Sequence, residues 1–409
     1  MKRRTGRLPD LGGAPGLADL RVPELPPPPR DAIARTDPAR MGLPRGCPET
    51  VEYARTEALR FLDKERNLDG NLRGVGLGLR EVNGEPTDEF ALTFLAYEKR
   101  PPDKVPKGCL LPRFVTRGNQ KIRVDVIEAP GEIQWTQTPC PQGSFDLSSC
   151  SGAAIATEAD GDWDGTLGGT WRRLDGSGHR GLTNCHVAIG DLSFQQFIAG
   201  LPGTIARLFE SPRGKRIFTG VPGAQNFQIM EIDTIWPILA PWLLPIPIAG
   251  ALPFVFLDCA AGDIDHRAVG NPLFLPPPPP PARNVRGGII TGARIRSAQA
   301  PIPGTEVYKV GAQTGTTFGR IRIAFLQIPI AIGPLIVIFD QVLARLAIAN
   351  GDSGSSMIER TDNHYIGSCW GGLPLNGPPV DLGGGNLMLD HALATPAHQT
   401  FWRMNLDLY

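Results

Sequence analysis

The sequence predicts a mainly β protein, preceded by a small α+β module and a disordered N-terminal arm. Its 409 residues include 49 glycines and 41 prolines, and both are above average usage, which favours a turn-rich β protein. Beyond Gly143, short apolar runs such as GTLGGTWRRLDG and EVYKVGAQTG alternate with glycine turns, a pattern typical of barrels and sandwiches. The length exceeds that of one ordinary domain, so we expect more than one unit.

Three segments follow from the order of these patterns. Residues 1–46 are rich in proline and lack apolar periodicity, so we expect a disordered arm. Residues 47–139 should form an accessory α+β module, and residues 140–409 the β domain. Within the module we expect a helix over 48–66, a hairpin of strands over 72–81 and 90–97, and a further strand over 121–128. A helix near 396–405 should close the chain.

Two apolar runs need an interpretation. Residues 235–257 contain 23 residues without charge, which is long enough to span a bilayer. Five prolines interrupt them, and each interior proline costs a helix about 3 kcal/mol. A buried or interface-forming insertion is therefore favoured over a membrane helix and over peripheral membrane contact. Residues 324–339 are too short to span, and we expect two strands around Gly333 and Pro334.

Charge and cysteine usage limit the class of partner and the compartment. Lys plus Arg and Asp plus Glu both number 41, so the chain has no electrostatic footprint for nucleic acid. The seven cysteines are odd in number and contain no CxxC pair, which argues against a disulfide framework and a zinc site. The N-terminus MKRRTGRLPDLGGAPG is basic but has no apolar stretch after it. These features together predict a cytoplasmic protein.

Two short motifs suggest nucleophilic chemistry. In Asn350-Gly351-Asp352-Ser353-Gly354-Ser355, glycines flank a serine, and acyl transfer needs a hydroxyl on a tight turn beside backbone N–H groups. An ordinary surface turn is the alternative. In LTNCHV, His186 follows an apolar strand, and its pKa near neutrality suits a general base if a serine lies beside it. Without that serine, a core or surface histidine without a catalytic role would be the better interpretation.

Four blocks in order resemble trypsin-like serine peptidases. GTLGGTWRRLDGSGHRGLTNCHV, VYKVGAQTGTTFGRI, NGDSGSSM and ALATPAHQTFW are especially similar to the bacterial and plant intracellular branch that includes the plant narrow-leaf protein. The likeness spans about residues 143–409, and the hairpin at 72–97 resembles the small module preceding the peptidase in that branch. The resemblance implies a chymotrypsin-like double β-barrel.

The resemblance also implies the order His, Asp, Ser along the chain. Between His186 and Ser353, Leu257-Asp258-Cys259-Ala260-Ala261 is similar to the family's V-D-A-A pattern, which makes Asp258 the expected acid. Asp233, in MEIDTIW, is the competitor, and Asp263 and Asp265 are less favoured because their stretch reads as a loop. The predicted triad is His186, Asp258 and Ser353. Cys185 departs from the family's usual residue before the histidine.

The remaining site residues come from the same resemblance. The backbone N–H groups of Gly351 and Ser353 would form the oxyanion hole. The strand carrying Ser368, Trp370 and Gly371 resembles the one that pairs with the substrate backbone, although Trp370 also suits a core position. Ala347 stands six residues before the nucleophile, where trypsin has an acid. We therefore expect a small or apolar primary side chain.

The sequence thus predicts a serine endopeptidase that acts on peptides or proteins and needs no metal or organic cofactor. A catalytically idle scaffold of the same fold, used for protein–protein assembly, is the main alternative. An esterase with the same nucleophile is a third interpretation. The apolar insertion at 235–257 makes a homo-oligomer the expected assembly.

Overall fold

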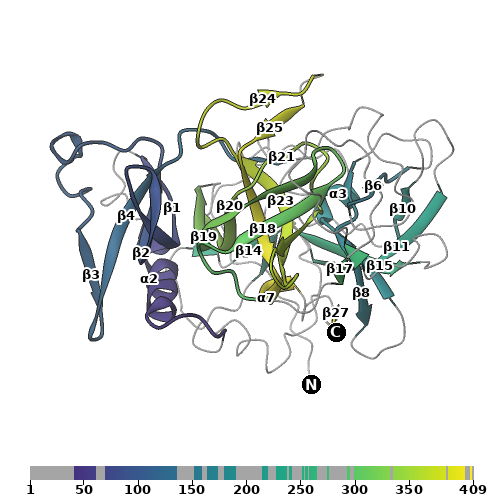
Figure 1. The fold of residues 1–409 in the computed structure, drawn as a ribbon, viewed down its shortest axis with the longest axis horizontal. Helices are drawn as coiled ribbons and strands as arrows, with labels where there is room; N and C mark the ends of the chain where they lie inside the picture. Colours follow the sequence, from purple (N-terminus) through teal and green to yellow (C-terminus); the bar gives the residue numbers. More distant parts are fainter. Residues whose placement is uncertain are drawn as a thin grey trace.

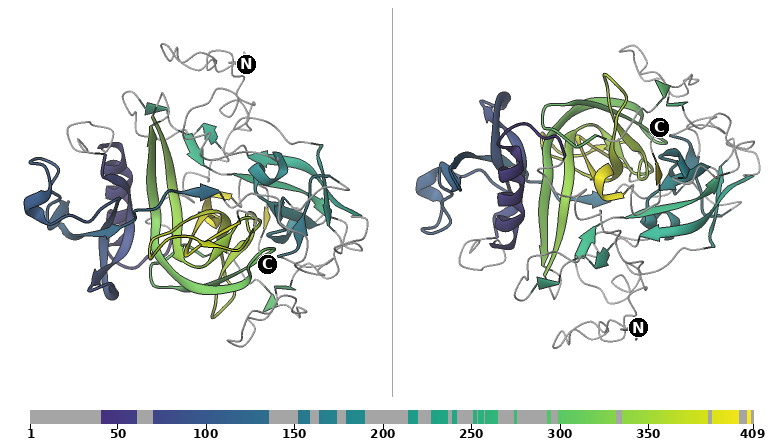
Figure 2. Two further views of the ribbon diagram at one scale, coloured as in Figure 1. Left: turned by 90° about the horizontal axis from the view of Figure 1, so that it is seen from above. Right: turned by 90° about the horizontal axis from the view of Figure 1, so that it is seen from below.

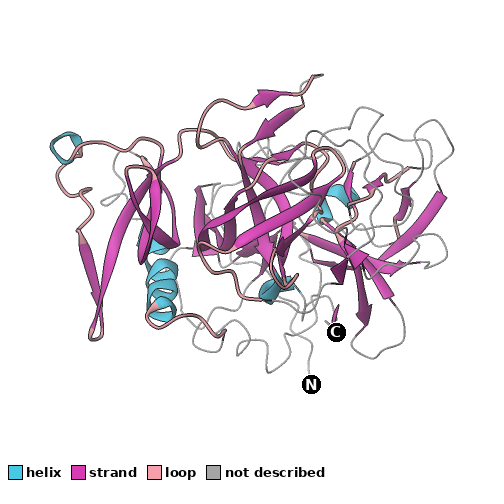
Figure 3. Ribbon diagram, viewed as in Figure 1, coloured by secondary structure: helices cyan, strands magenta, loops and turns pink. Residues whose placement is uncertain are grey.

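The structure is a computed structural model, and most of the described chain is β-strand (Figures 1 and 3). It describes residues 41–60, 70–135, 152–158, 164–173, 179–189, 214–219, 227–236, 239–241, 251–252, 254–256, 258–264, 274–275, 293–294, 299–331, 335–383, 386–400 and 406–407. Figure 2 shows the N-terminal module, the C-terminal barrel and the N-terminal barrel arranged in a row. The predicted mainly β class is confirmed.

The described part of the module at 47–139 contains one α-helix, a short 3₁₀ helix and strands of the large sheet. Helix α2 (Cys47–Arg60) packs on the hairpin of β1 (Leu72–Val82) and β2 (Glu85–Ala96). The hairpin turn is Asn83-Gly84, with φ of 55° and 83°, the conformation that favours Asn-Gly in two-residue loops. The 3₁₀ helix η2 (Pro102–Lys104) follows, and then β3 (Phe114–Arg117) and β4 (Gln120–Glu128). Strand β4 lies parallel to β2 and antiparallel to β3.

The module continues the sheet of the C-terminal barrel. Strand β1 pairs with β19 (Gly315–Ala331), with Gly78 opposite Ile323. Glu81 of β1 binds Arg322 of β19 through two hydrogen bonds of 2.7 and 2.9 Å. One apolar core includes Cys47, Val51 and Leu77 of the module together with barrel residues such as Phe325. The module and the barrel therefore share both a sheet and a core.

The C-terminal barrel is a closed ring of antiparallel strands. In ring order these are β18 (Glu306–Gly311), β19, β20 (Leu335–Arg345), β26 (His391–Pro396), β23 (Tyr365–Leu373) and β22 (Ser356–Glu359). The last of them, β22, pairs back with β18. The run 324–339 thus forms parts of two strands around Gly333 and Pro334, as predicted.

The N-terminal barrel is built from shorter strands. A sheet joins β10 (Arg216–Thr219), β11 (Phe227–Trp236), β15 (Cys259–Ile264), β9 (His179–Thr183), β8 (Gly169–Arg173) and β27 (Leu406–Asp407). Strand β7 (Gly165–Thr166) leads into β8 and pairs with β6 (Ala154–Ile155). Ala156 then bridges Phe218 on β10 through two backbone hydrogen bonds, which closes the ring. Its interior is aliphatic, including Ile155, Leu167, Ile217, Met230 and Ile232. The predicted double β-barrel is confirmed.

Short pairings account for the described parts of the other segments. These are β5 (Gln134–Trp135), β12 (Leu239–Pro241), β13 (Ala251–Leu252), β14 (Phe254–Phe256), β16 (Phe274–Leu275), β17 (Ala293–Arg294), β21 (Ile348–Ala349), β24 (Val380–Asp381) and β25 (Leu387–Leu389). In the run 235–257, the described pieces are strands, with β12 paired to β14 and β13 paired to β20. Within the described chain, no helix is both long and apolar enough to cross a membrane.

The ends of the predicted segments can be compared with the structure. The expected helix at 48–66 is observed over Cys47–Arg60, and residues 61–69 lie outside the described residues. The expected arm also lies outside them except for residues 41–46, in which Met41 and Leu43 pack against the shared core. The C-terminal helix α7 (Ala397–Thr400) begins where expected, and residues 401–405 are outside the described part.

Candidate active site

The three predicted triad residues come from both barrels. His186 lies in the short helix α3 (Cys185–Ile189), directly after β9, and Asp258 directly precedes β15. Because β15 pairs with β9, with Ala260 opposite Thr183, residues 72 apart in the sequence become neighbours. Ser353 lies in the turn between β21 and β22 of the C-terminal barrel.

His186 and Asp258 form a fully buried pair. The Nδ1 atom of His186 lies 2.5 Å from Oδ2 of Asp258, and the backbone N–H of His186 donates to Oδ1 at 2.9 Å. Both side chains have 0% exposure. Asn184 donates from Nδ2 to the backbone oxygen of Asp258 at 2.8 Å. A carboxylate held on Nδ1 fixes the tautomer in which Nε2 can accept a proton.

The backbone at Asp258 is in the left-handed region, with φ of 46°. This conformation is uncommon for residues other than glycine, and such strained positions concentrate at functional sites. This backbone conformation occurs where the chain enters β15, and here the carboxylate of Asp258 contacts both the imidazole ring and the backbone N–H of His186.

Ser353 lies in a tight turn between two glycines of positive φ, Gly351 at 95° and Gly354 at 94°. The N–H of Asp352 donates to Ala349 at 3.0 Å, and that of Gly354 donates to Cys369 at 2.8 Å. The Ser353 hydroxyl donates to the backbone oxygen of Trp370 at 3.2 Å. The turn thus holds the serine against β23, and the predicted oxyanion donors, the N–H groups of Gly351 and Ser353, belong to this turn.

The turn rests on a buried ion pair that the sequence reasoning missed. Asp352 binds Nζ of Lys309 at 2.8 Å, and both side chains have 0% exposure. Its two oxygens also accept from the N–H groups of Gln313, Thr314 and Ala349 and from the Thr314 hydroxyl, at 2.7–3.1 Å. Lys309 lies in the block VYKVGAQTG. The signal available in the sequence was a positively charged residue within an apolar strand, opposite in charge to Asp352 of the serine turn.

The two barrels meet beside Ser353. The N–H of Thr166 donates to the backbone oxygen of Ser353 at 2.8 Å, and its hydroxyl donates to that of Gly351 at 2.7 Å. A Cβ on Gly165 would lie 2.7 Å from the side chain of Val187 and 2.9 Å from the oxygen of Ser353. Since Val187 follows His186, the histidine helix and the serine turn both pack against this glycine.

The predicted substrate-binding residues occupy different environments. Ser368 accepts a hydrogen bond from Asn184 at 3.4 Å, which joins β23 to the strand end that bears the histidine. The side chain of Trp370 is fully buried and donates from Nε1 to Gln341 at 2.8 Å, so the indole belongs to the barrel interior. Ala347 is half-buried and its backbone oxygen accepts from Thr317. Gly371 pairs with β5.

The other candidates for the acid lie elsewhere. Asp233 on β11 is exposed and pairs with Arg180. Asp263 is exposed on β15, so the loop expected at this residue is wrong, and Asp265 lies outside the described residues. Cys185, next to the histidine, is a buried free thiol. Of the acids considered from the sequence, Asp258 is therefore the one that the structure brings to His186.

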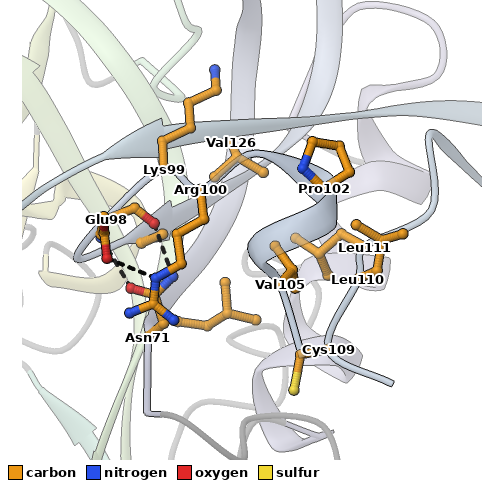
Figure 4. A pocket seen from close by; sticks show the side chains of 12 residues that line it. Asn71, Glu98, Lys99, Arg100, Pro102, Val105, Cys109, Leu110, Leu111 and Val126 are labelled. Carbon is orange, nitrogen blue, oxygen red and sulfur yellow. Dashed lines mark hydrogen bonds and ion pairs between the residues drawn. The ribbon is translucent and has the colours of Figure 1, made fainter. Parts of the chain in front are cut away.

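Within the described ranges, no group of three metal-ligating side chains is gathered. A pocket lies instead on the accessory module (Figure 4), where Arg100 binds Glu98 at 2.7 Å beside Asn71, Cys109 and Leu110. None of the predicted site residues lines it.

Comparisons with known proteins find similarity of fold only. No protein-family model matches the chain, and no curated protein matches it. Thermobifida fusca protease A is similar at 15% identity with a TM-score of 0.37, covering 63% of this chain and 97% of that one. Nocardiopsis protease shows 12% and 0.37, with 63% and 97% coverage. Cellulomonas bogoriensis chymotrypsin shows 14% and 0.35, with 65% and 99% coverage. Function is therefore inferred from the side-chain geometry.

Proposed function

We propose that the protein is a serine endopeptidase in which Ser353, His186 and Asp258 act as the triad. The observation that carries this proposal is the buried contact between His186 and Asp258, at 2.5 Å, beside a glycine-flanked serine turn. Two barrels contribute the pair and the serine separately, and they meet at Gly165 and Thr166. The ordered blocks that resemble the narrow-leaf branch support the same assignment.

The chemistry would run by acyl transfer. Ser353 Oγ attacks the peptide carbonyl as its proton moves to Nε2 of His186, and the same proton then passes to the leaving amine. Water repeats the sequence to release the acid. Asp258 keeps the proton of Nδ1 in place and stabilises the imidazolium. The N–H groups of Gly351 and Ser353 stabilise the oxyanion, where one donor is worth about 2.7–4 kcal/mol.

Primary specificity should favour small or apolar side chains. Ala347 supplies no charge at the position where trypsin has an acid. The next residue, Ile348, packs together with Leu389 closely against Gly372 of β23, so the surroundings of this position are apolar. A peptide library would show cuts after small or apolar residues. Cleavage after arginine at the same rate would contradict this specificity.

Cytoplasmic location and self-association belong to the same proposal. The scattered cysteines without a CxxC pair support the location, and the apolar run 235–257 supports a homo-oligomer. Light scattering at micromolar concentration should give a mass above the 44.1 kDa of one chain. A mass equal to one chain would contradict self-association.

The test compares the wild type with Ser353→Ala in casein cleavage and fluorophosphonate labelling. Loss of a triad serine costs on the order of a million-fold in turnover, so both signals should disappear. Asp258→Asn should lower turnover about 10⁴-fold. Thr361→Ala, which removes a hydroxyl from an exposed turn, is the matched control and should retain both signals. Absence of labelling and cleavage in the wild type would instead favour the idle scaffold.

A further inference from the structure

The segment from Ala129 to Trp135, here called the strap, runs from the accessory module to the candidate active site. Its first residue is fixed to the module, because the N–H of Ala129 donates to Ala96 at 2.7 Å. The guanidinium of Arg73, only 8% exposed, donates to the backbone oxygens of Ala129, at 2.7 Å, and Gly131. A buried arginine thus holds the strap by its backbone.

The middle of the strap is pressed against the chain that follows β23. A Cβ on Gly131 would lie 2.1 Å from Cγ and 2.7 Å from the backbone oxygen of Pro374. Contacts under 3 Å do not occur for real Cβ atoms, so only glycine fits here without a shift. Ile133, two residues on, is 5% exposed. These contacts fix both the position and the register of the strap.

The strap ends as strand β5, which pairs antiparallel with β23. Trp135 lies opposite Gly371, and Gln134 lies opposite Gly372. The same two glycines pair on their other edge with β26, opposite Leu393 and Ala392. Both edges of β23 are therefore occupied at this point. In Figure 2 the short blue strand at the end of the strap lies against the yellow strands of the C-terminal barrel.

This edge lies directly beside the nucleophile. Ser353 donates to the backbone oxygen of Trp370, the neighbour of Gly371. Because β5 is antiparallel to β23, it runs from Gly372 toward Trp370 and so toward the serine. A peptide whose carbonyl is to reach Ser353 in extended form gains its backbone hydrogen bonds by adding a strand to an exposed edge. The edge next to the serine carries β5.

We propose that the strap is a built-in competitor for the peptide site. It occupies the edge of β23 at Gly371 and Gly372, and an extended peptide pairs there only after β5 leaves. The statement about turnover depends on the proposed peptidase function, whereas the competition for the edge does not. A tethered segment has an effective concentration in the millimolar range, and a site open only part of the time binds with an affinity lowered by that fraction.

The experiment uses Gly131→Val in the full chain with Ser353→Ala, so that bound peptide is not cut. The valine collides with Pro374 and should detach the strap. The probe is a fluorescein-labelled peptide of the strap's own sequence, APGEIQW, followed by anisotropy. Its affinity should rise at least about tenfold in Gly131→Val. Pro130→Val places the same side chain on the exposed neighbouring residue and should leave the affinity unchanged.

Hydrogen exchange checks that β5 has been released. The amides of residues 371 and 372 point to opposite edges of β23. The one that faces β5 should lose protection in Gly131→Val and regain it with peptide, whereas the one that faces β26 should stay protected. A second variant, Gln134→Pro with Trp135→Pro, removes both backbone N–H groups of β5 while keeping Arg73 and Gly131. It gives the same readout if the valine variant fails to fold. Equal peptide affinity in the variants with β5 detached would overturn the proposal.

The outcomes also separate the strap from the peptidase. With Ser353 restored, Gly131→Val should cleave peptides at least about tenfold faster at low substrate than Pro130→Val. Tighter peptide binding with no cleavage and no fluorophosphonate labelling in any variant would reject the peptidase and keep the strap. Cleavage and labelling at equal rates in both valine variants, with equal peptide affinity, would keep the peptidase and reject the strap.

Discussion

Replacing Lys309 with methionine leaves the carboxylate of Asp352 buried with no cation beside it. Breaking a buried ion pair by removing one partner costs about 3–5 kcal/mol. Asp352 still accepts from three backbone N–H groups and the Thr314 hydroxyl. These donors stabilise the remaining charge, so we expect the lower end, about 3 kcal/mol of unfolding free energy.

The matched control is Arg320→Met on the neighbouring strand β19. Arg320 pairs with Glu306 at 2.8 Å, but their side chains are 62% and 43% exposed, and exposed pairs are worth at most about 1 kcal/mol. Urea unfolding followed by tryptophan fluorescence gives both losses. If the loss falls on the serine turn, fluorophosphonate labelling of Ser353 should also slow by about two orders of magnitude. Equal losses in the two variants would refute the reasoning.

Three further predictions concern buried groups. Arg55 forms an ion pair with Asp340 and is one-fifth exposed. Arg55→Met should therefore lower the free energy of unfolding in urea by roughly 2–3 kcal/mol, somewhat less than the loss of a fully buried pair. A loss under about 1 kcal/mol would contradict a stabilising role of this pair. Burial lowers the pKa of His391, and Arg322 and Arg345 act in the same direction while Asp390 opposes them. The unfolded chain then binds the extra proton more readily, so the stability contributed by this group should be full above about pH 6.5 and fall below it. His391→Gln should make the melting temperature less dependent on pH between about pH 7 and 5.5. An unchanged pH dependence in this variant would show that His391 is not its cause. Burial raises the pKa of the Cys47 and Cys369 thiols to about 12. When the protein is treated with a thiol reagent at about pH 8, peptide mapping should therefore show Cys109 modified before either of them. Early modification of Cys369 would contradict its burial.

The parts of the site that lie close together in sequence could be predicted directly. The glycines around Ser353 announce a tight turn, and the hairpin turn at Asn83 and Gly84 follows from the conformational preference of those residues. His186 could be proposed because one ionisable group follows an apolar strand. Asp258 needed the resemblance, since several other acids, Asp233 and Asp263 among them, stand in the same interval. The fold singles out Asp258 because the pairing of β15 with β9 brings its carboxylate to His186.

The rest depended on pairings between distant segments. Lys309 and Asp352 are 43 residues apart, and nothing in the local pattern shows that the two side chains form one buried pair. The strap also could not be predicted, because the two residues of β5 are too few to give a strand pattern and their partner on β23 lies 236 residues further on. Continuity of the module with the barrel was missed for the same reason. A period of two identifies a strand but not its neighbour.

The join between β1 and β19 has a consequence for synthesis of the chain. Gly78 and Ile323 are partners in the sheet and are 245 residues apart. At about 5–20 residues per second, the hairpin leaves the ribosome roughly 12–50 s before the strand that covers its edge exists. During that interval an apolar edge strand is exposed, which is a hazard for aggregation. We therefore expect nascent chains that stop before residue 315 to recruit chaperones, and the barrel that completes the sheet to release them.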